Sequence, residues 1–200
     1  FVMLGIFAMN LQGMSGGMLQ MINHGISTGA LFLIVGFIYE RRHTRLIADF
    51  GGLSKVMPVF ATIFMIVTFS SIGLPGTNGF VGEFLILVGA FESELRVFTV
   101  FATTGVILAA VYMLWMFQRV MMGKITNPAN ENLKDLSARE VIVMLPLLLF
   151  IFWIGFYPNT FLEKMNPSID NLINQVKEKQ QVAMMAENMD HSVTQVIVNE

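Results

Sequence analysis

Two ionisable residues of this chain lie inside apolar segments. Glu83 is the only carboxylic acid within an apolar segment of spanning length, and His24 is the only imidazole within one. Burial disfavours the charged form of a carboxyl group, and an imidazole passes protons between its two nitrogens near neutral pH. We therefore predict that Glu83 is a proton carrier and His24 a proton relay, with a packing histidine as the alternative for His24.

A polar stripe accompanies His24. Gln20, His24 and either Ser27 or Thr28 recur at helical spacing, so they share one face of the helix expected over residues 18–40. Together with water, these side chains would extend the relay. No second His or acid lies at ligand spacing, so we predict no metal site.

The segment before Glu83 is unusual for a membrane helix. Residues 70–84 interrupt a hydrophobic run with Pro75, Gly76 and Gly79. Proline removes a backbone donor and glycine loosens the chain, so helix geometry should fail here and leave backbone carbonyls and amides without intrahelical partners. A broken helix at membrane depth followed by a lone acid indicates an ion or substrate pathway. A short surface loop with a solvated Glu83 is the alternative.

The composition is that of an integral membrane protein. Of 200 residues, 54% are hydrophobic and 13% charged, against roughly 25% charged residues in soluble domains. Because the sequence contains no Cys, it holds no thiolate-ligated iron–sulfur cluster, zinc–thiolate site or disulfide. No GxGxxG or Walker motif predicts a nucleotide site, and a net charge of −2 gives no support to nucleic-acid binding.

Hydropathy predicts an all-α polytopic membrane protein, a bundle of transmembrane helices. The expected segments are a helix end over 1–9, a Gly-rich turn over 10–17, and spans over about 18–40, 58–91 (broken near 75–79), 97–122 and 141–157. The polar tail over 158–200 should form a short amphipathic helix followed by disorder. Because the chain begins in an apolar segment without an initiator Met, we expect it to be the C-terminal part of a longer protein.

The basic residues predict the topology. If the two halves around Pro75 form one discontinuous span, the basic loops over 41–57 and 119–140 lie on the same, cytoplasmic side. The acidic link over 92–96 and the tail then face outward. This arrangement places the break and Glu83 inside the protein at membrane depth, which favours a functional role for both.

Some features have simpler interpretations. His43 and His191 fall in a charged loop and in the tail, so both are expected to face solvent. Gly25 and Gly29 form a GxxxG pair, which would let another helix backbone approach closely or would simply assist packing.

Several motifs in fixed order carry a resemblance to a known family. They are MINHG at 21–25, LFLIVG at 31–36, YER at 39–41, HTR at 43–45, GGL at 51–53, GLPG at 73–76 and GEF at 82–84. Over residues 1–157, the chain resembles the antiporter-like subunit M family of complex I, the NADH:quinone oxidoreductase, whose mitochondrial members are called subunit 4.

The resemblance implies an antiporter-like fold of two inverted repeats, each with a discontinuous helix, in a proton-pumping membrane arm. By position, Glu83 matches the key acid of the second broken helix, and His24 matches the histidine of the preceding helix. The implied function couples electron transfer from NADH to quinone, elsewhere in the complex, to proton pumping. The family's other essential groups, a glutamate and lysines, would lie upstream of this chain.

The resemblance also implies partners and a location. FMN, iron–sulfur clusters and quinone are expected in other subunits and none in this chain. The expected partners are neighbouring membrane-arm subunits, including other antiporter-like ones, in a bacterial inner membrane. Two alternatives are a subunit of a Mrp-type cation/proton antiporter and a non-conducting membrane scaffold in which the broken helix serves packing only.

Overall fold

The computed structural model describes the backbone of residues 1–198 and the side chains of residues 1–185. The described residues form helices and no strands, which confirms the predicted all-α class. The helices are α1 (Val2–Phe7), α2 (Leu11–Arg42), α3 (Pro58–Ser71), α4 (Asn78–Phe91), α5 (Arg96–Met121), α6 (Ala138–Phe156) and α7 (Asn159–Val198), with 3-10 turns η1 (Ile47–Asp49), η2 (Leu53–Lys55) and η3 (Pro128–Asn130).

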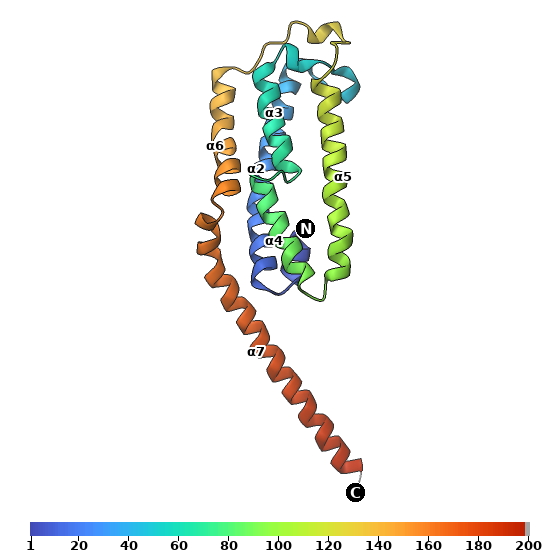
Figure 1. Cartoon of the computed structure of the whole chain (residues 1–200), viewed down its shortest axis with the longest axis vertical. Helices are drawn as coiled ribbons and strands as arrows, with labels where there is room; N and C mark the ends of the chain where they lie inside the picture. The colour runs from blue at the N-terminus through green and yellow to red at the C-terminus, as the bar shows by residue number, and fades with distance from the viewer. Residues whose placement is uncertain (199–200) are drawn as a thin grey trace.

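Helices α3 and α4 lie one after the other along α2 (Figure 1). Each has 14 residues, about 21 Å of helix, so neither alone would cross the roughly 30 Å hydrocarbon core, whereas the pair would. By length and composition, α2, α5 and α6 are each long and apolar enough to cross a membrane. The two short helices therefore act as one interrupted span beside three continuous ones.

The two basic loops lie at the same end of the bundle. The loop after α2 and the loop after α5 meet there, while the link from α4 to α5 and the whole of α7 lie at the opposite end (Figure 1). Gly52 N–H donates to the Met122 carbonyl (3.0 Å), which joins the two loops directly. This is the geometry that the charge pattern predicts for one discontinuous span.

The Gly-rich segment over 10–17 is helical, so the turn predicted there is wrong. Asn10 caps α2 by accepting from Gly13 N–H (2.8 Å), and its amide also donates to the Gly89 carbonyl in α4 (2.7 Å). A Cβ on Gly16 would lie 2.7 Å from the Ile86 amide nitrogen of α4. The glycines belong to the helix because α4 packs directly against its backbone.

Gly25 and Gly29 do not pack against another helix among the described residues. A Cβ added to either would meet nothing within 4 Å. The GxxxG pair is therefore not the close-packing site of α2; Gly13, Gly16 and Gly17 are, about two to four turns earlier in the same helix.

The basic end is fastened by an ion pair. Arg41 in α2 forms a bidentate pair with Glu140 in the first turn of α6, with N–O distances of 2.7 and 2.8 Å. The same guanidinium donates to the Phe37, Lys134 and Asp135 carbonyls. The Asp135 carboxylate accepts from the first amides of α3, at Val59 and Phe60, and caps that helix. One loop thus ties α2, α3 and α6 together.

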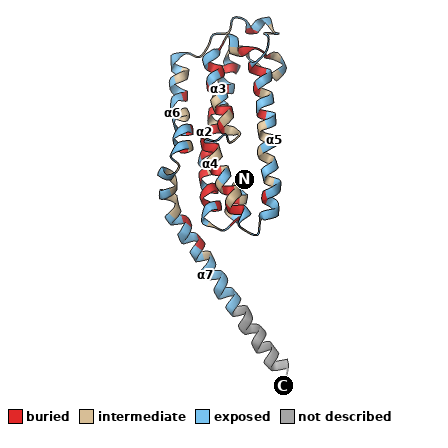
Figure 2. Ribbon diagram, in the orientation of Figure 1, coloured by how far each residue is buried: buried red, intermediate tan, exposed pale blue. Residues whose placement is uncertain are grey.

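The tail forms a longer helix than predicted. Instead of a short helix followed by disorder, α7 runs without interruption over Asn159–Val198, and residues 199–200 lie outside the described part. Ile169 and Ile173 are buried against Met14 of α2, and Ser15 donates to Asn166 (2.8 Å). Beyond Ile173 the described side chains are exposed or only partly buried (Figure 2). His191 lies outside the described side chains, whereas His43 is exposed as expected.

Candidate functional site

The break between α3 and α4 occupies residues 72–77. Ile72 N–H donates to the Thr68 carbonyl (3.1 Å) and Leu74 N–H donates to the Phe69 carbonyl (3.0 Å). The carbonyls of Thr68 and Phe69 are therefore paired with amides of the break, the second of them outside the i to i+4 pattern of a helix, as expected where helix geometry fails. Wrapping the last carbonyls into a turn is the usual way in which a helix end satisfies them.

Pro75 and Gly76 form a tight turn inside the break. Thr77 N–H donates to the Leu74 carbonyl (3.0 Å), and Gly76 takes the positive φ of +92° that the third position of such a turn requires. Gly76 also lies against α6, since a Cβ there would be 3.4 Å from the Phe156 ring. The turn thus packs against α6 at Gly76, while Leu74 and Pro75 are exposed.

Three buried polar side chains join the break to α2. Ser70 hydroxyl donates to Asn78 Oδ1 (2.6 Å), and Asn78 Nδ2 donates to the Ser27 hydroxyl (3.3 Å). The Ser27 and Ser70 oxygens are 2.7 Å apart, and because the Ser70 hydrogen is committed to Asn78, Ser27 is the donor between them. This closed ring links the end of α3, the start of α4 and the middle of α2.

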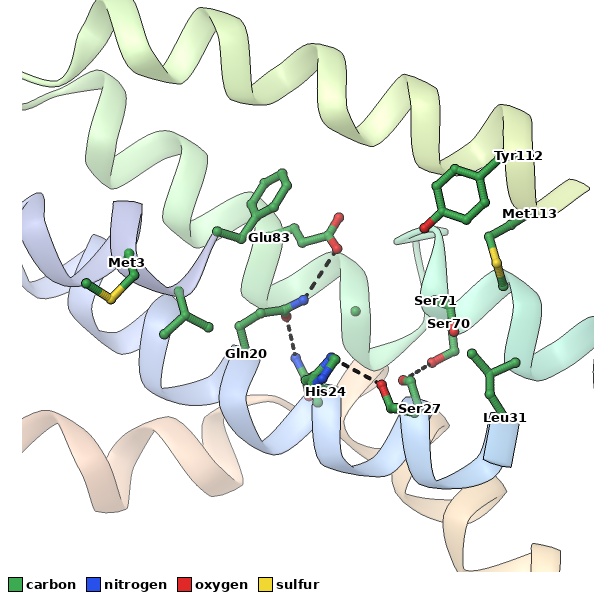
Figure 3. A pocket seen from close by; sticks show the side chains of 15 residues that line it. Met3, Gln20, His24, Ser27, Leu31, Ser70, Ser71, Glu83, Tyr112 and Met113 are labelled. Atoms are coloured by element: carbon green, nitrogen blue, oxygen red, sulfur yellow. Dashed lines mark hydrogen bonds between the residues drawn. The ribbon is translucent and has the colours of Figure 1, made fainter. Parts of the chain in front are cut away.

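Glu83 lies in the second turn of α4 and is half-buried. Gln20 Nε2 of α2 donates to its Oε1 (3.3 Å), and Gln20 Oε1 in turn accepts from Asn23 Nδ2 (3.2 Å). Its other oxygen lies beside the break, where a Cβ on Gly73 would come within 2.7 Å of Oε2. The carboxyl group is therefore fixed between α2 and the turn that interrupts the span (Figure 3).

His24 lies on the same wall of α2 as Gln20. Its Nδ1 and the Thr28 hydroxyl are 3.1 Å apart, a hydrogen bond along the helix. That partner orients the imidazole and leaves Nε2 without it, on a side chain that is exposed among the described residues.

One cavity of about 540 Å³ joins these groups. Its walls include Gln20, Asn23, His24, Ser27 and Thr28 of α2, Ser70 and Ser71 of α3, Gly79 and Glu83 of α4, and Tyr112 and Met113 of α5. All five residues of the predicted proton path, namely Glu83, His24, Gln20, Ser27 and Thr28, thus line it (Figure 3). Among the described residues, no three His, Cys, Asp or Glu side chains gather into a metal-binding group.

Sequence reasoning missed Asn23 and Asn78. Both are fully buried, at 1% and 0% exposure, and both bond across the interface between α2 and α4. A signal for Asn23 existed, because it lies three residues after Gln20 and four before Ser27, within the same polar stripe. Asn78 carried no comparable signal, since an Asn after Pro-Gly-Thr is common in surface turns.

Residues 1–109 match the family described as NADH:quinone oxidoreductase/Mrp antiporter, TM. The chain is 45% identical over 177 residues to the NADH-ubiquinone oxidoreductase chain 4 of Marchantia polymorpha, an alignment that covers 88% of this chain and 36% of that protein. It is 46% identical over 173 residues to the NADH-quinone oxidoreductase subunit M of Rhodobacter capsulatus, covering 86% and 34%. The chain thus spans about a third of the length of these curated relatives.

Two solved structures share the arrangement of helices. A chain of respiratory complex I from Thermus thermophilus with bound NADH matches with 31% identity and a TM-score of 0.81, over 86% of this chain and 36% of that chain. A chain of the Mrp complex from Dietzia sp. DQ12-45-1b matches with 20% identity and a TM-score of 0.77, over 90% and 41%. The second likeness shows the fold alone.

Proposed function

Because the chain belongs to the NADH:quinone oxidoreductase/Mrp antiporter transmembrane family, we propose that it forms part of a proton-translocating subunit of an NADH:quinone oxidoreductase. It is a multi-pass membrane protein. The observation that carries the proposal is the carboxyl group of Glu83 on the wall of a cavity that it shares with Gln20 and His24, beside an interrupted span in an otherwise apolar bundle. Ionisable groups in such places mark proton and ion pathways.

Glu83 is the proton carrier in this proposal. Its carboxylate accepts a proton from the cavity and later returns it, beside the helix ends at Ser70, Ser71 and Gly79 that flank the break and line the cavity. His24 exchanges protons with the same cavity through Nε2, while Thr28 holds the ring through Nδ1. Cavity water connects the two groups, because the hydrogen bonds of Glu83 lead into amide side chains and not to His24.

The neighbouring residues divide into two roles. Carboxylic acids, imidazoles and hydroxyls both accept and donate a proton, whereas an amide holds its hydrogens and only orients its neighbours. Gln20 is therefore a positioning residue for Glu83. Ser27 belongs to the ring that holds the break, since its hydroxyl is engaged with Ser70 and Asn78.

Electron transfer is assigned to other subunits. The chain would supply only proton movement, coupled to the oxidation of NADH and the reduction of quinone by partners that hold FMN and iron–sulfur clusters. Neighbouring antiporter-like subunits of the membrane arm are the proposed contacts, and a bacterial inner membrane is the proposed location. The 46% identity to the subunit M of Rhodobacter capsulatus supports this assignment.

The test is Glu83→Gln in the complete complex, with proton pumping and quinone reduction measured in the same membranes. Glutamine keeps the size and polarity of the side chain but cannot release a proton, so both activities should fall roughly tenfold or more while the complex still assembles. Glu94→Gln, at an acid of the link between α4 and α5, is the matched control and should leave both unchanged. If pumping is unchanged in Glu83→Gln, Glu83 is not the proton carrier and the break between α3 and α4 has only a structural role.

A Mrp-type cation/proton antiporter subunit is the second candidate, because the same family description and the same fold include it. The two differ in their partners. Copurification with iron–sulfur subunits supports the oxidoreductase, and sodium-dependent growth without a redox partner supports the antiporter.

A further inference from the structure

Asn23 occupies the junction between the proton-carrying site and the helix break. It is 1% exposed, and its Nδ2 donates to two acceptors, the Asn78 carbonyl (2.7 Å) and Gln20 Oε1 (3.2 Å). Asn78 is the first residue of α4, whose second turn carries Glu83. Among the described hydrogen bonds, those of Asn23 are the ones that connect Gln20 to the start of α4.

The Asn78 carbonyl fixes which way the side-chain amides of Asn23 and Gln20 point. A backbone carbonyl only accepts, so Asn23 must turn its NH₂ group toward Asn78. Gln20 Oε1 then faces that same NH₂ group, which leaves the Gln20 NH₂ group to point at Glu83. Reversing Asn23 would set its Oδ1 against the carbonyl oxygen of Asn78.

The side-chain oxygen of Asn23 indicates that this amide orientation serves its two acceptors. Asn23 Oδ1 is buried and has no hydrogen-bond donor among the described residues. A buried amide placed only for its own stability would pair both ends, because an unpaired buried acceptor is costly. The amide is instead turned entirely toward its two acceptors on Gln20 and Asn78.

The side-chain amides of Gln20 and Asn23 pack against α4 at Gly82, which has no side chain. A Cβ on Gly82 would collide with Gln20 Oε1 and would lie 2.9 Å from Asn23 Nδ2. The pair therefore packs on α4 one residue before Glu83, at a position where only glycine gives it room.

We propose that Asn23 is a positioning residue, which holds the Gln20 amide with its N–H toward Glu83. Because Asn23 also donates to the Asn78 carbonyl, the orientation of Gln20 depends on the position of the start of α4. The inference rests on the proposed function, in which Glu83 carries the proton. A shift of α4 relative to α2 would move the Asn78 carbonyl and so loosen the donor that faces Glu83. The position of α4 at the break is thereby coupled to the hydrogen bond that Glu83 receives from Gln20.

The test uses Asn23→Leu in the complete complex, with Asn130→Leu as the matched control. Leucine is close to asparagine in size and lacks the two donors. Asn130 is also fully buried and hydrogen-bonded, to Arg42 and to the Asp49 carbonyl, but lies in η3, within the loop between α5 and α6. Asn23→Leu should lower proton pumping roughly tenfold, the effect of losing one charge-assisted hydrogen bond, and Asn130→Leu should not change pumping per assembled complex.

Infrared difference spectroscopy measures the hydrogen bonding of the Glu83 carboxyl group, which should not change if Asn23 has only a packing role. The carboxyl C=O band assigned to Glu83 by its loss in Glu83→Gln should move to higher wavenumber in Asn23→Leu, because its donor is no longer held. The band should keep its position in Asn130→Leu. If Asn23→Leu does not assemble, Asn23→Ser, which retains one donor, is measured in its place and should shift the band less than Gln20→Leu.

The outcomes separate this inference from the proposed function. If Glu83→Gln lowers pumping, and Asn23→Leu both lowers pumping and shifts the Glu83 band while Asn130→Leu does neither, the inference stands. If Glu83→Gln abolishes pumping but neither the pumping nor the Glu83 band responds to Asn23→Leu or Asn23→Ser, Asn23 has only a packing role. If Glu83→Gln is silent, the proposed function fails first.

Discussion

Replacing Gly82 with Ala tests how closely α2 and α4 must approach for the site to form. The new methyl group would collide with Gln20 Oε1 and come within 2.9 Å of Asn23 Nδ2 and 3.2 Å of the backbone of α2 at Gln20. The end of the Gln20 side chain can swing away, but the backbone cannot, so the two helices must separate by a few tenths of an ångström. The substitution should therefore break the bond from Gln20 to Glu83 before it disrupts the bundle.

The size of the effect follows from these distances. Overpacking costs about 1–3 kcal/mol, and the two hydrogen bonds of Gln20 contribute about 1 kcal/mol each. The gain from placing alanine in a helix offsets about 1 kcal/mol. The net destabilisation should be about 2–4 kcal/mol, accompanied by a roughly tenfold loss of proton pumping.

The assay compares Gly82→Ala with Gly25→Ala in the complete complex. Gly25 lies in α2 with nothing within 4 Å of an added Cβ, so its substitution should be neutral or slightly stabilising. The midpoint of thermal inactivation and the pumping rate are measured for both variants. Equal behaviour of the two would refute the reasoning, because it would mean that the close approach of Gly82 to the amide pair does not matter to the site.

Two further predictions concern the ends of the bundle. Arg41→Lys keeps the charge but loses the bidentate ion pair with Glu140 and at least one hydrogen bond to a carbonyl. The midpoint of thermal inactivation should therefore fall by the equivalent of about 1–2 kcal/mol. An unchanged midpoint would show that the ion pair contributes nothing to stability. Ile173→Ala removes a buried side chain that fastens α7 to Met14, at about 2–4 kcal/mol. Limited proteolysis should then cut the tail faster than in Leu172→Ala, whose side chain is 47% exposed, and equal rates would contradict the docking.

The local chemistry of the sequence determined the elements of this protein. Long apolar runs are helices of spanning length because a chain in lipid must satisfy its backbone internally. Pro75, Gly76 and Gly79 together predicted an interruption, because proline removes a backbone donor and glycine loosens the chain, and the structure has it at residues 72–77. Helical spacing was enough to place Gln20, His24 and Thr28 on one face. These properties depend on a residue and its near neighbours in the chain.

Tertiary structure decided which of these residues meet. The bond between Gln20 and Glu83 joins residues 63 positions apart, and no local pattern indicates it. The Gly-rich start of α2 had the composition of a turn and became helix only because α4 packs on its bare backbone, while the GxxxG pair at Gly25 and Gly29 found no partner among the described residues. Burial of Asn23 and Asn78 has the same origin. A polar side chain becomes part of a site only when a second helix excludes water from it and supplies its hydrogen-bond partners.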